Sequence, residues 1–317
     1  MTATTNSPLR SCTYTPESTW PIRPISGGRR DTSSGAFGLI AYRSAIDARF
    51  IADPPRNTSG ASNPARLTST KALQPIAMPP TDEARQRAYY RLTAASYHER
   101  HVSQLDEHGL ALDLLVMLAR HQGVAGSFLD VGAGTGRAMK TLATAFPQAR
   151  VQGIEPVAEL RQQAVILNGI SGLDLHEGDA LQLPFADDSF DWVVETGVLH
   201  HIRHWSQAVA EMARVGRYGV LISDTNNIGQ GSPRTRKLKK LIKILGLWNA
   251  FVWLQTKGKM SKWSEGDGLY YSFCAFDALP LLRGKFGQVQ VMNTQGSGEA
   301  DLLGTVSHVA IVARLAA

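Results

Sequence analysis

The segment FLDVGAGTGRAM, residues 128–139, combines an apolar run, an acid and a glycine-rich turn. The acid is Asp130, and the glycines are Gly132, Gly134 and Gly136. Such a turn between a strand and a helix lets a nucleotide approach the backbone closely. A dinucleotide-binding turn reads GxGxxG, but Arg137 stands at its third position here. A carboxylate at 130 suits a cationic ligand better than a pyrophosphate. The alternative is an ordinary strand-to-helix turn without a ligand.

Three acids downstream are placed to bind a nucleoside. Glu155 ends the next expected strand, about 20 residues past the turn, where an acid can accept hydrogen bonds from both ribose hydroxyls. Asp179 and Ala180 follow the third expected strand, and the acid can accept from an adenine amino group. Glu195 ends the fourth expected strand, and we expect it to contact the same ligand.

The adjacent histidines His200 and His201 are the candidate catalytic residues. They follow the fourth expected strand, at the carboxyl edge of the sheet where ligands bind. A histidine there can remove the proton of an acceptor hydroxyl. The alternative is that either histidine packs or caps locally. With His204 the segment could suggest a metal site, but no carboxylate or cysteine nearby completes the ligand set, so the sequence predicts none.

These side chains need a sheet to position them. Apolar runs and helical patterns alternate from residue 127 onwards, which predicts a parallel sheet with helices on both faces. The last two strands, 289–293 and 308–313, have a glycine-rich connection without a helix and should pair antiparallel at the sheet edge. Helices are expected before the first strand, over 81–100 and in a segment that ends at Gly123.

The motifs DVGAGTG, GDA, LPFADDSFDWV and VLHH, with Glu155, resemble class I S-adenosylmethionine-dependent methyltransferases of the type-eleven branch, which includes ubiquinone- and menaquinone-biosynthesis enzymes. The resemblance covers about residues 85–223. It implies a Rossmann-like, doubly wound, seven-stranded, mostly parallel α/β sheet with an antiparallel last strand. It also implies S-adenosylmethionine as cofactor. Asp130, Gly132 and Gly134 would line its methionine end, Glu155 its ribose, and Asp179 and Ala180 its adenine.

In this family the first helix covers the cofactor. Tyr89 and Tyr97 lie eight residues apart on that helix and are expected to share a face. Tyr97 could therefore lie over the sulfonium through a cation–π contact. The alternative is core packing of both rings.

An insertion over residues 225–270 is expected to bind the acceptor and to determine which acceptor is used. Asp224 and Asn226 leave the fifth strand at its carboxyl end, and Tyr270 lies in a second polar segment. Polar groups around flat aromatic rings suit a hydroxylated acceptor, such as a sugar or a polyol head group. Ordinary turn chemistry is the alternative.

Residues 225–263 hold nine basic residues and no acid. Leu238, Leu241, Ile242 and Leu245 mark one face of a helix there. We expect a lid whose apolar face closes over the site. The alternative is peripheral contact of residues 234–262 with an anionic membrane or a lipid-linked substrate. No nucleic-acid partner is expected, because no recognised motif accompanies the basic residues.

The remaining sequence bounds the class of protein. The chain has 317 residues, 43% hydrophobic and 19% charged, with no apolar run long enough for a membrane span and no secretory signal. The two cysteines form no pair, which fits a reducing, cytoplasmic compartment. Residues 1–80 are predicted to be a disordered tail or an over-long start, and 81–317 a methyltransferase domain opened by helices over 81–122.

The sequence thus predicts a methyltransferase that acts on a small-molecule acceptor, a hydroxyl of a polar, sugar-like or lipid-linked compound. Methylation of carbon or nitrogen stays open, and no oligomeric state is predicted. One alternative is a cofactor-binding assembly or regulatory protein without turnover. Another is an NAD-linked oxidoreductase, which the glycine spacing disfavours.

Overall fold

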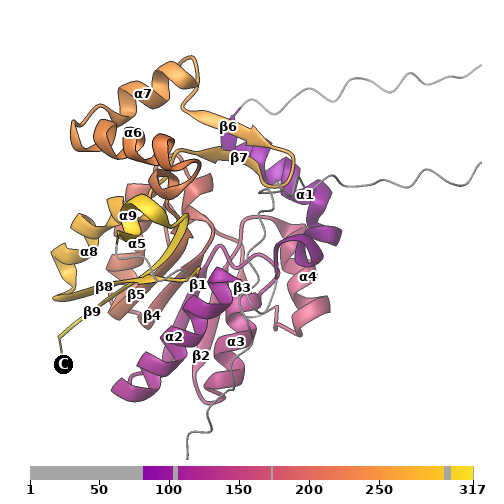
Figure 1. Ribbon diagram of the computed structural model, residues 1–317. Coiled ribbons are helices and arrows are strands. Elements are labelled where there is room, and N and C mark those ends of the chain that lie inside the picture. Colours follow the sequence, from indigo (N-terminus) through magenta and orange to yellow (C-terminus); the bar gives the residue numbers. More distant parts are fainter. Residues whose placement is uncertain (1–80, 103–105, 173, 296–300, 317) are drawn as a thin grey trace, which may run out of the picture. The chain divides into compact units, whose positions relative to one another are not determined.

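A seven-stranded sheet forms the centre of the computed structural model, which describes residues 81–102, 106–172, 174–295 and 301–316 (Figure 1). The strand order is β3-β2-β1-β4-β5-β9-β8, with β9 antiparallel to both of its neighbours and the other central pairs parallel. The predicted sheet with its reversed last strand is confirmed. The strands are β1 (Ser127–Val131), β2 (Arg150–Ile154), β3 (Leu175–His176), β4 (Phe190–Thr196), β5 (Gly216–Thr225), β8 (Gln288–Asn293) and β9 (His308–Arg314). The predicted tail, residues 1–80, lies outside the described residues.

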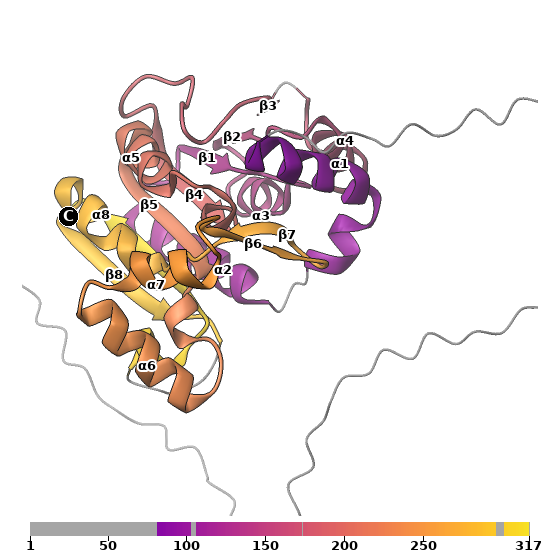
Figure 2. The ribbon, with the colours of Figure 1, turned by 90° about the horizontal axis from the view of Figure 1, so that it is seen from above.

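Helices cover both faces of the sheet (Figure 2). One layer consists of α2 (Glu107–Gln122), α3 (Arg137–Ala145) and α4 (Ala158–Asn168), and the other of α5 (Trp205–Val215) and α8 (Leu279–Lys285). Successive side chains of a strand point to opposite faces. Trp192 therefore packs beneath the first layer and Val193 beneath the second.

The helix α1 (Asp82–His101) lies beside α4 (Figure 1), which it contacts through Ala94, Val157 and Leu160. Thr81 caps it as predicted, since its hydroxyl accepts from Ala84 N at 3.1 Å. The short helices are η1 (Leu199–His201), η2 (Asn227–Gly229), η3 (Ala275–Ala278) and α9 (Leu302–Thr305). The expectation of no helix between the last two strands was wrong, because α9 lies there.

The insertion after β5 holds two helices, in keeping with the helical pattern of its sequence. It also holds a β-hairpin, which the sequence did not predict. These elements are α6 (Pro233–Ile244), α7 (Trp248–Gln255), β6 (Ser261–Ser264) and β7 (Gly268–Tyr271). The hairpin lies beside α1 (Figure 1). None of these helices, nor any other in the described part of the chain, is long and apolar enough to cross a membrane.

The orientation predicted for the amphipathic helix was wrong. Leu238 and Leu241 on α6 are each 53% exposed, whereas Ile242 packs against the core. The basic side chains instead tie α6 to the body. Lys243 donates to Asp277 at 2.5 Å, and the ammonium of its neighbour Lys240 pairs with Asp301 at 2.7 Å. Leu238, Leu241 and Leu245 of the apolar stripe therefore face outward, whereas Ile242 faces inward beside the ion pairs.

A buried carboxylate links the start of β1 to β4. Asp191 is 4% exposed and accepts from Gly126 N at 2.9 Å and Ser127 N at 3.1 Å. We expect Asp191→Ala to lower the free energy of unfolding by about 2–3 kcal/mol, because both buried donors lose their acceptor. Urea denaturation measures this effect. Asp113→Ala, on an exposed position of α2, serves as control and should change stability by less than about 0.5 kcal/mol. Equal losses in both variants would contradict this role.

Candidate functional site

The glycine turn after β1 leaves space that a larger residue would fill. Gly132 and Gly134 both have positive φ angles, +73° and +54°. A Cβ on Gly132 would stand 2.4 Å from a methyl carbon of Val198, and one on Gly134 would stand 3.6 Å from the ring of Tyr97. Both positions therefore require glycine for backbone conformation, and Gly132 requires it for space as well.

Asp130 lies buried next to this turn. It is 1% exposed, and among the described residues only the backbone N–H of Met139 lies close to its carboxylate, without the geometry of a full hydrogen bond. Burial raises the pKa of Asp130 to about 7. An unpaired buried carboxylate is costly unless a cation or a donor reaches it. The side chain therefore suits a cationic ligand, although it does not line either of the cavities described below.

Glu155 follows β2 and contacts the glycine turn through its carboxylate. Its two carboxylate oxygens accept from Gly134 N at 2.9 Å and from Val157 N at 2.8 Å, which fixes the carboxyl group. The side chain is 5% exposed, and burial raises its pKa to about 7. A carboxylate held by two backbone donors keeps lone pairs free for two hydroxyl groups of a ligand.

Two cavities meet at the turn. The smaller cavity, of about 130 Å³, contains Glu155, Asp179 and Ala180, which the sequence assigned to the nucleoside. The larger cavity, of about 780 Å³, opens toward the insertion and the start of α2. The residues that line both are Tyr90, Tyr97, Gly132, Gly134 and Gly197.

Tyrosines of α1 form the wall between the cavities. The Tyr97 ring packs edge-on against Tyr90 at 5.6 Å and stacks on His101 at 4.7 Å. The Tyr97 ring lies against the turn, 3.6 Å from the position of a Cβ on Gly134. Its expected companion Tyr89 instead donates to the carbonyl of Glu265 in the hairpin. Residues seven apart lie closer to two full helical turns than residues eight apart, which explains why Tyr90 takes this place.

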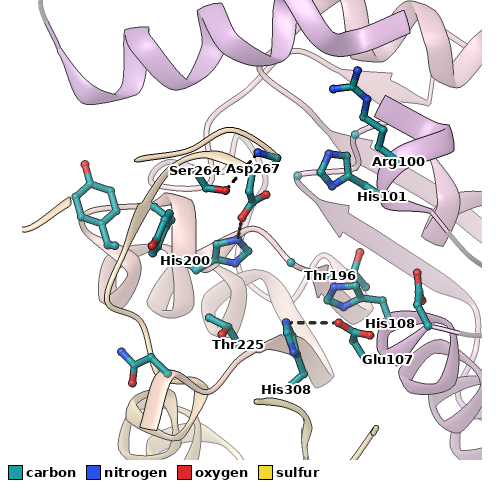
Figure 3. Close-up of a pocket in the computed structure, with 18 of the residues that line it drawn as sticks. Arg100, His101, Glu107, His108, Thr196, His200, Thr225, Ser264, Asp267 and His308 are labelled. Atoms are coloured by element: carbon teal, nitrogen blue, oxygen red, sulfur yellow. Dashed lines mark hydrogen bonds and ion pairs between the residues drawn. The ribbon is translucent and has the colours of Figure 1, made fainter. Parts of the chain in front are cut away.

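The histidine pair lies on η1, directly after β4. His200 Nδ1 lies 2.8 Å from Asp224 Oδ1, and His200 Nε2 lies 3.2 Å from Asp267 Oδ2. Burial alone would lower the pKa of His200, but these two carboxylates outweigh it and raise the pKa to about 10. His200 lines the larger cavity, as Figure 3 shows.

The second histidine has a different environment. His201 Nδ1 lies 2.7 Å from the carbonyl oxygen of Leu269, so this nitrogen carries the proton and Nε2 accepts from Tyr90 Oη at 2.8 Å. Burial, and then the charge of His200, lowers the pKa of His201. His201 lines the smaller cavity. The charged histidine thus faces the larger cavity and the neutral one the smaller.

Two of the residues expected to contact the cofactor are turned away from it. Gly136 lines neither cavity, and a Cβ there would meet Ile170 at 2.7 Å, so this glycine serves the packing of α3 against α4. Glu195 is fully buried and accepts from the backbone nitrogens of Val198 and Leu199. It holds the turn that carries the histidines.

Of the residues expected to bind the acceptor, one lines the larger cavity and two are buried away from it. Tyr270 lines the larger cavity. Asp224 is fully buried behind His200. Asn226 is also fully buried and donates to the carbonyl of Val306 at 2.8 Å, so its expected contact with acceptor is wrong. Its neighbour Asn227 lines the larger cavity instead, with a side-chain oxygen that has no partner among the described residues.

Several residues of the larger cavity gave no signal in the sequence. His108 lies at the start of α2. His308 lies at the start of β9, with its Nε2 3.5 Å from Glu107 Oε1 (Figure 3). Asp267 sits in the turn between β6 and β7. Single polar residues in loops far apart along the chain form no motif, so only the fold reveals their proximity.

Residues 129–223 match the family model described as a methyltransferase domain. This stretch lies within residues 85–223, the part of the chain that carries the motif resemblance.

Curated relatives match the same part of the chain. The ubiquinone/menaquinone biosynthesis C-methyltransferase UbiE of Desulfotalea psychrophila is 32% identical over 95 residues, which are 30% of this chain and 39% of the relative. The malonyl-(acyl-carrier protein) O-methyltransferase of Methylococcus capsulatus is 36% identical over 103 residues, 32% of this chain and 37% of the relative. The chain spans less than half the length of the first curated relatives it matches.

Among solved structures, the chain resembles magnesium protoporphyrin IX methyltransferase from Synechocystis PCC 6803. The two sequences are 18% identical, and the match covers 74% of this chain and 100% of the other, with a TM-score of 0.48.

Proposed function

We propose that the protein transfers a methyl group from S-adenosylmethionine to a polar small molecule. The observation that carries the proposal is the junction of the two cavities at Tyr97, Gly132 and Gly134. The smaller cavity has the acids that suit a nucleoside. The larger cavity, lined by Tyr270, Asn227 and His200, has the volume and polarity for an acceptor.

The residues at the turn fit the cofactor. Asp130 lies buried beside the turn and lines neither cavity, so its charge would favour a cationic ligand without direct contact. Glu155 would accept from the ribose hydroxyls, and Asp179 would accept from the adenine amino group. S-adenosylmethionine, when bound, supplies a methyl group on a positively charged sulfur. The faces of Tyr97 and Tyr90 would then stabilise that charge.

We propose that the accepting atom is an oxygen. The acceptor O–H bond breaks and its proton passes to solvent, the methyl–sulfur bond breaks with its electrons left on sulfur, and a carbon–oxygen bond forms. The chain must hold the three atoms in line, and orientation alone can lower the barrier by about 7–11 kcal/mol. Asn227 and Trp248 line the larger cavity, and Asn227 Oδ1 and Trp248 Nε1 have no partner within the described part of the chain. A small rotation of either side chain would let it orient the acceptor.

A labelled methyl donor tests this function. We expect a small-molecule extract incubated with the protein and methyl-labelled S-adenosylmethionine to yield a labelled product of low molecular mass. Glu155→Gln serves as the inactive control. Cofactor binding without any labelled product would instead support the alternative, a cofactor-binding protein without turnover. The large cavity beside His200 argues against that alternative.

We further propose that α6 and α7 bind an anionic lipid surface. They expose a set of large apolar side chains: Leu238, Leu241, Ile244, Leu245, Leu247, Trp253 and Leu254. Nine basic residues and no acid lie within 225–263, so the surrounding charge complements anionic head groups. An acceptor with a lipid anchor would then reach the larger cavity from the membrane.

We expect the double variant Leu241→Gln, Leu245→Gln to bind phosphatidylserine-containing vesicles at least tenfold more weakly, because two exposed apolar side chains no longer enter the interface. Vesicle co-sedimentation measures the binding. Leu92→Gln, at an 86% exposed position of α1, is the matched control and should bind as the unaltered protein does. Binding that is absent from the unaltered protein, or equal in all three, would contradict the proposal.

A further inference from the structure

Three side chains from two distant segments converge at the wall of the larger cavity. His200 and His201 come from η1, and Asp267 comes from the turn of the β6–β7 hairpin. One nitrogen of each histidine and one oxygen of Asp267 all lie within 4.8 Å of one another. The sequence gave no metal site here because no carboxylate stands nearby along the chain. The fold supplies one from residue 267.

The distances fit the edges of a coordination polyhedron. His200 Nε2 lies 3.2 Å from Asp267 Oδ2, and His201 Nε2 lies 3.4 Å from Asp267 Oδ1. Two ligands about 2.1 Å from one ion, at angles of about 90–109°, lie roughly 3.0–3.4 Å apart. The ligand atoms of the two histidines lie within 4.8 Å of each other, so small movements of both rings and of Asp267, which is 39% exposed, would bring all three side chains to one ion.

The other ring nitrogens are held in the way that metal-binding histidines usually are. His200 Nδ1 faces the buried Asp224 carboxylate at 2.8 Å, and His201 Nδ1 faces the carbonyl oxygen of Leu269 at 2.7 Å. Such partners fix the ring orientation and leave Nε2 as the ligand atom. Both Nε2 atoms are thereby turned toward Asp267.

The position of the cluster also leaves room for a further ligand. His200 and Asp267 line the larger cavity, and Figure 3 shows Asp267 reaching from the hairpin toward His200. The hydroxyl of Tyr90, 2.8 Å from His201 Nε2, is the group that an ion would displace. Catalytic metal sites keep such open positions for substrate, whereas structural sites are closed.

We propose that His200, His201 and Asp267 bind a first-row divalent cation, with open coordination positions facing the larger cavity. Two imidazoles and one carboxylate favour zinc, cobalt, iron or manganese over calcium. The role of the ion rests on the proposed methyl transfer: it would hold an oxygen of the acceptor. It would lower the pKa of the acceptor hydroxyl, whose proton would pass to solvent, so that neither histidine has to act as the base.

Cobalt titration of the chelator-treated full chain tests the site. We expect Co²⁺ to produce visible absorption bands that saturate at one equivalent, and Zn²⁺ to abolish them. In Asp267→Asn the affinity should fall by about 100-fold, because an amide is a much weaker ligand than a carboxylate. Glu265→Gln removes the same charge from the same hairpin turn but not from the cluster, and should bind Co²⁺ as the unaltered protein does.

Two results would overturn the proposal: no Co²⁺ bands at about 1 mM metal, or equal affinity in Asp267→Asn and the unaltered protein. Thermal melting shows whether each variant is folded, and His201→Gln replaces Asp267→Asn if that variant fails to fold. S-adenosylhomocysteine binding is measured separately on the same samples. Labelled methyl transfer that persists without metal would remove this inference and leave the proposed function. Absence of cofactor binding in every sample would remove the function and leave the metal spectrum.

Discussion

Glu155→Gln should weaken the binding of S-adenosylhomocysteine by about 100-fold or more. The carboxylate accepts from Gly134 N and Val157 N and must also accept from the ribose. Glutamine has a single side-chain oxygen, so its amide group would face one of these donors without accepting from it. Isothermal titration calorimetry measures the change directly.

Glu177→Gln is the matched control for this variant. Glu177 follows β3 and pairs with Arg161, whose guanidinium also donates to the carbonyl oxygen of Glu155. Its side chain is 75% exposed, and we expect the affinity to change by less than about threefold. Thermal melting without ligand shows whether both variants are folded. Similar losses in both variants, or no loss in Glu155→Gln, would contradict the assignment of the ribose to Glu155.

His200→Asn should lower the rate of labelled methyl transfer by about 10²-fold while leaving cofactor affinity within about threefold, because an acceptor that is held less accurately reacts more slowly. The asparagine amide can still donate to Asp224, so the buried carboxylate keeps a partner. The group that faces the larger cavity, Nε2, is lost. Because His200 lines that cavity and not the smaller one, the effect should fall on transfer and not on cofactor binding.

His121→Asn, at an exposed position in the last turn of α2, controls for loss of a histidine elsewhere and should transfer at the normal rate. Full activity of His200→Asn would show that the histidine pair has only a structural role. Equal losses of transfer and of S-adenosylhomocysteine binding would place His200 at the cofactor instead.

The sequence predicted the sheet, and the positions of the glycine turn and of Glu155 relative to it, because these depend on local patterns. The turn at Gly132 and Gly134 and the acid at Glu155 follow their strands directly, so register along the chain fixes their positions. Thr81 and Gly123 mark helix ends through capping and through a positive φ angle, which are also local effects.

The acceptor side was predicted less well, because it depends on contacts between distant segments. Asn226 and Asn227 are neighbours, and only the course of the chain after β5 decides which one faces the larger cavity. Asp267 lies close to the histidines because it stands in the turn of the β6–β7 hairpin. The sequence of this hairpin has no strong strand pattern, so the hairpin was not predicted. The apolar face of α6 was assigned inward by periodicity alone. In the structure its leucines face outward, and ion pairs such as Lys243 with Asp277 lie on the inward side.

A crystal structure of the protein with S-adenosylhomocysteine tests the central claim most directly. We predict both ribose hydroxyls within about 3 Å of the Glu155 carboxylate, the adenine beside Asp179, and the sulfur between Tyr97 and the turn at Gly132. The larger cavity should remain open next to the sulfur. A ligand bound outside the smaller cavity, or a ribose remote from Glu155, would contradict the account.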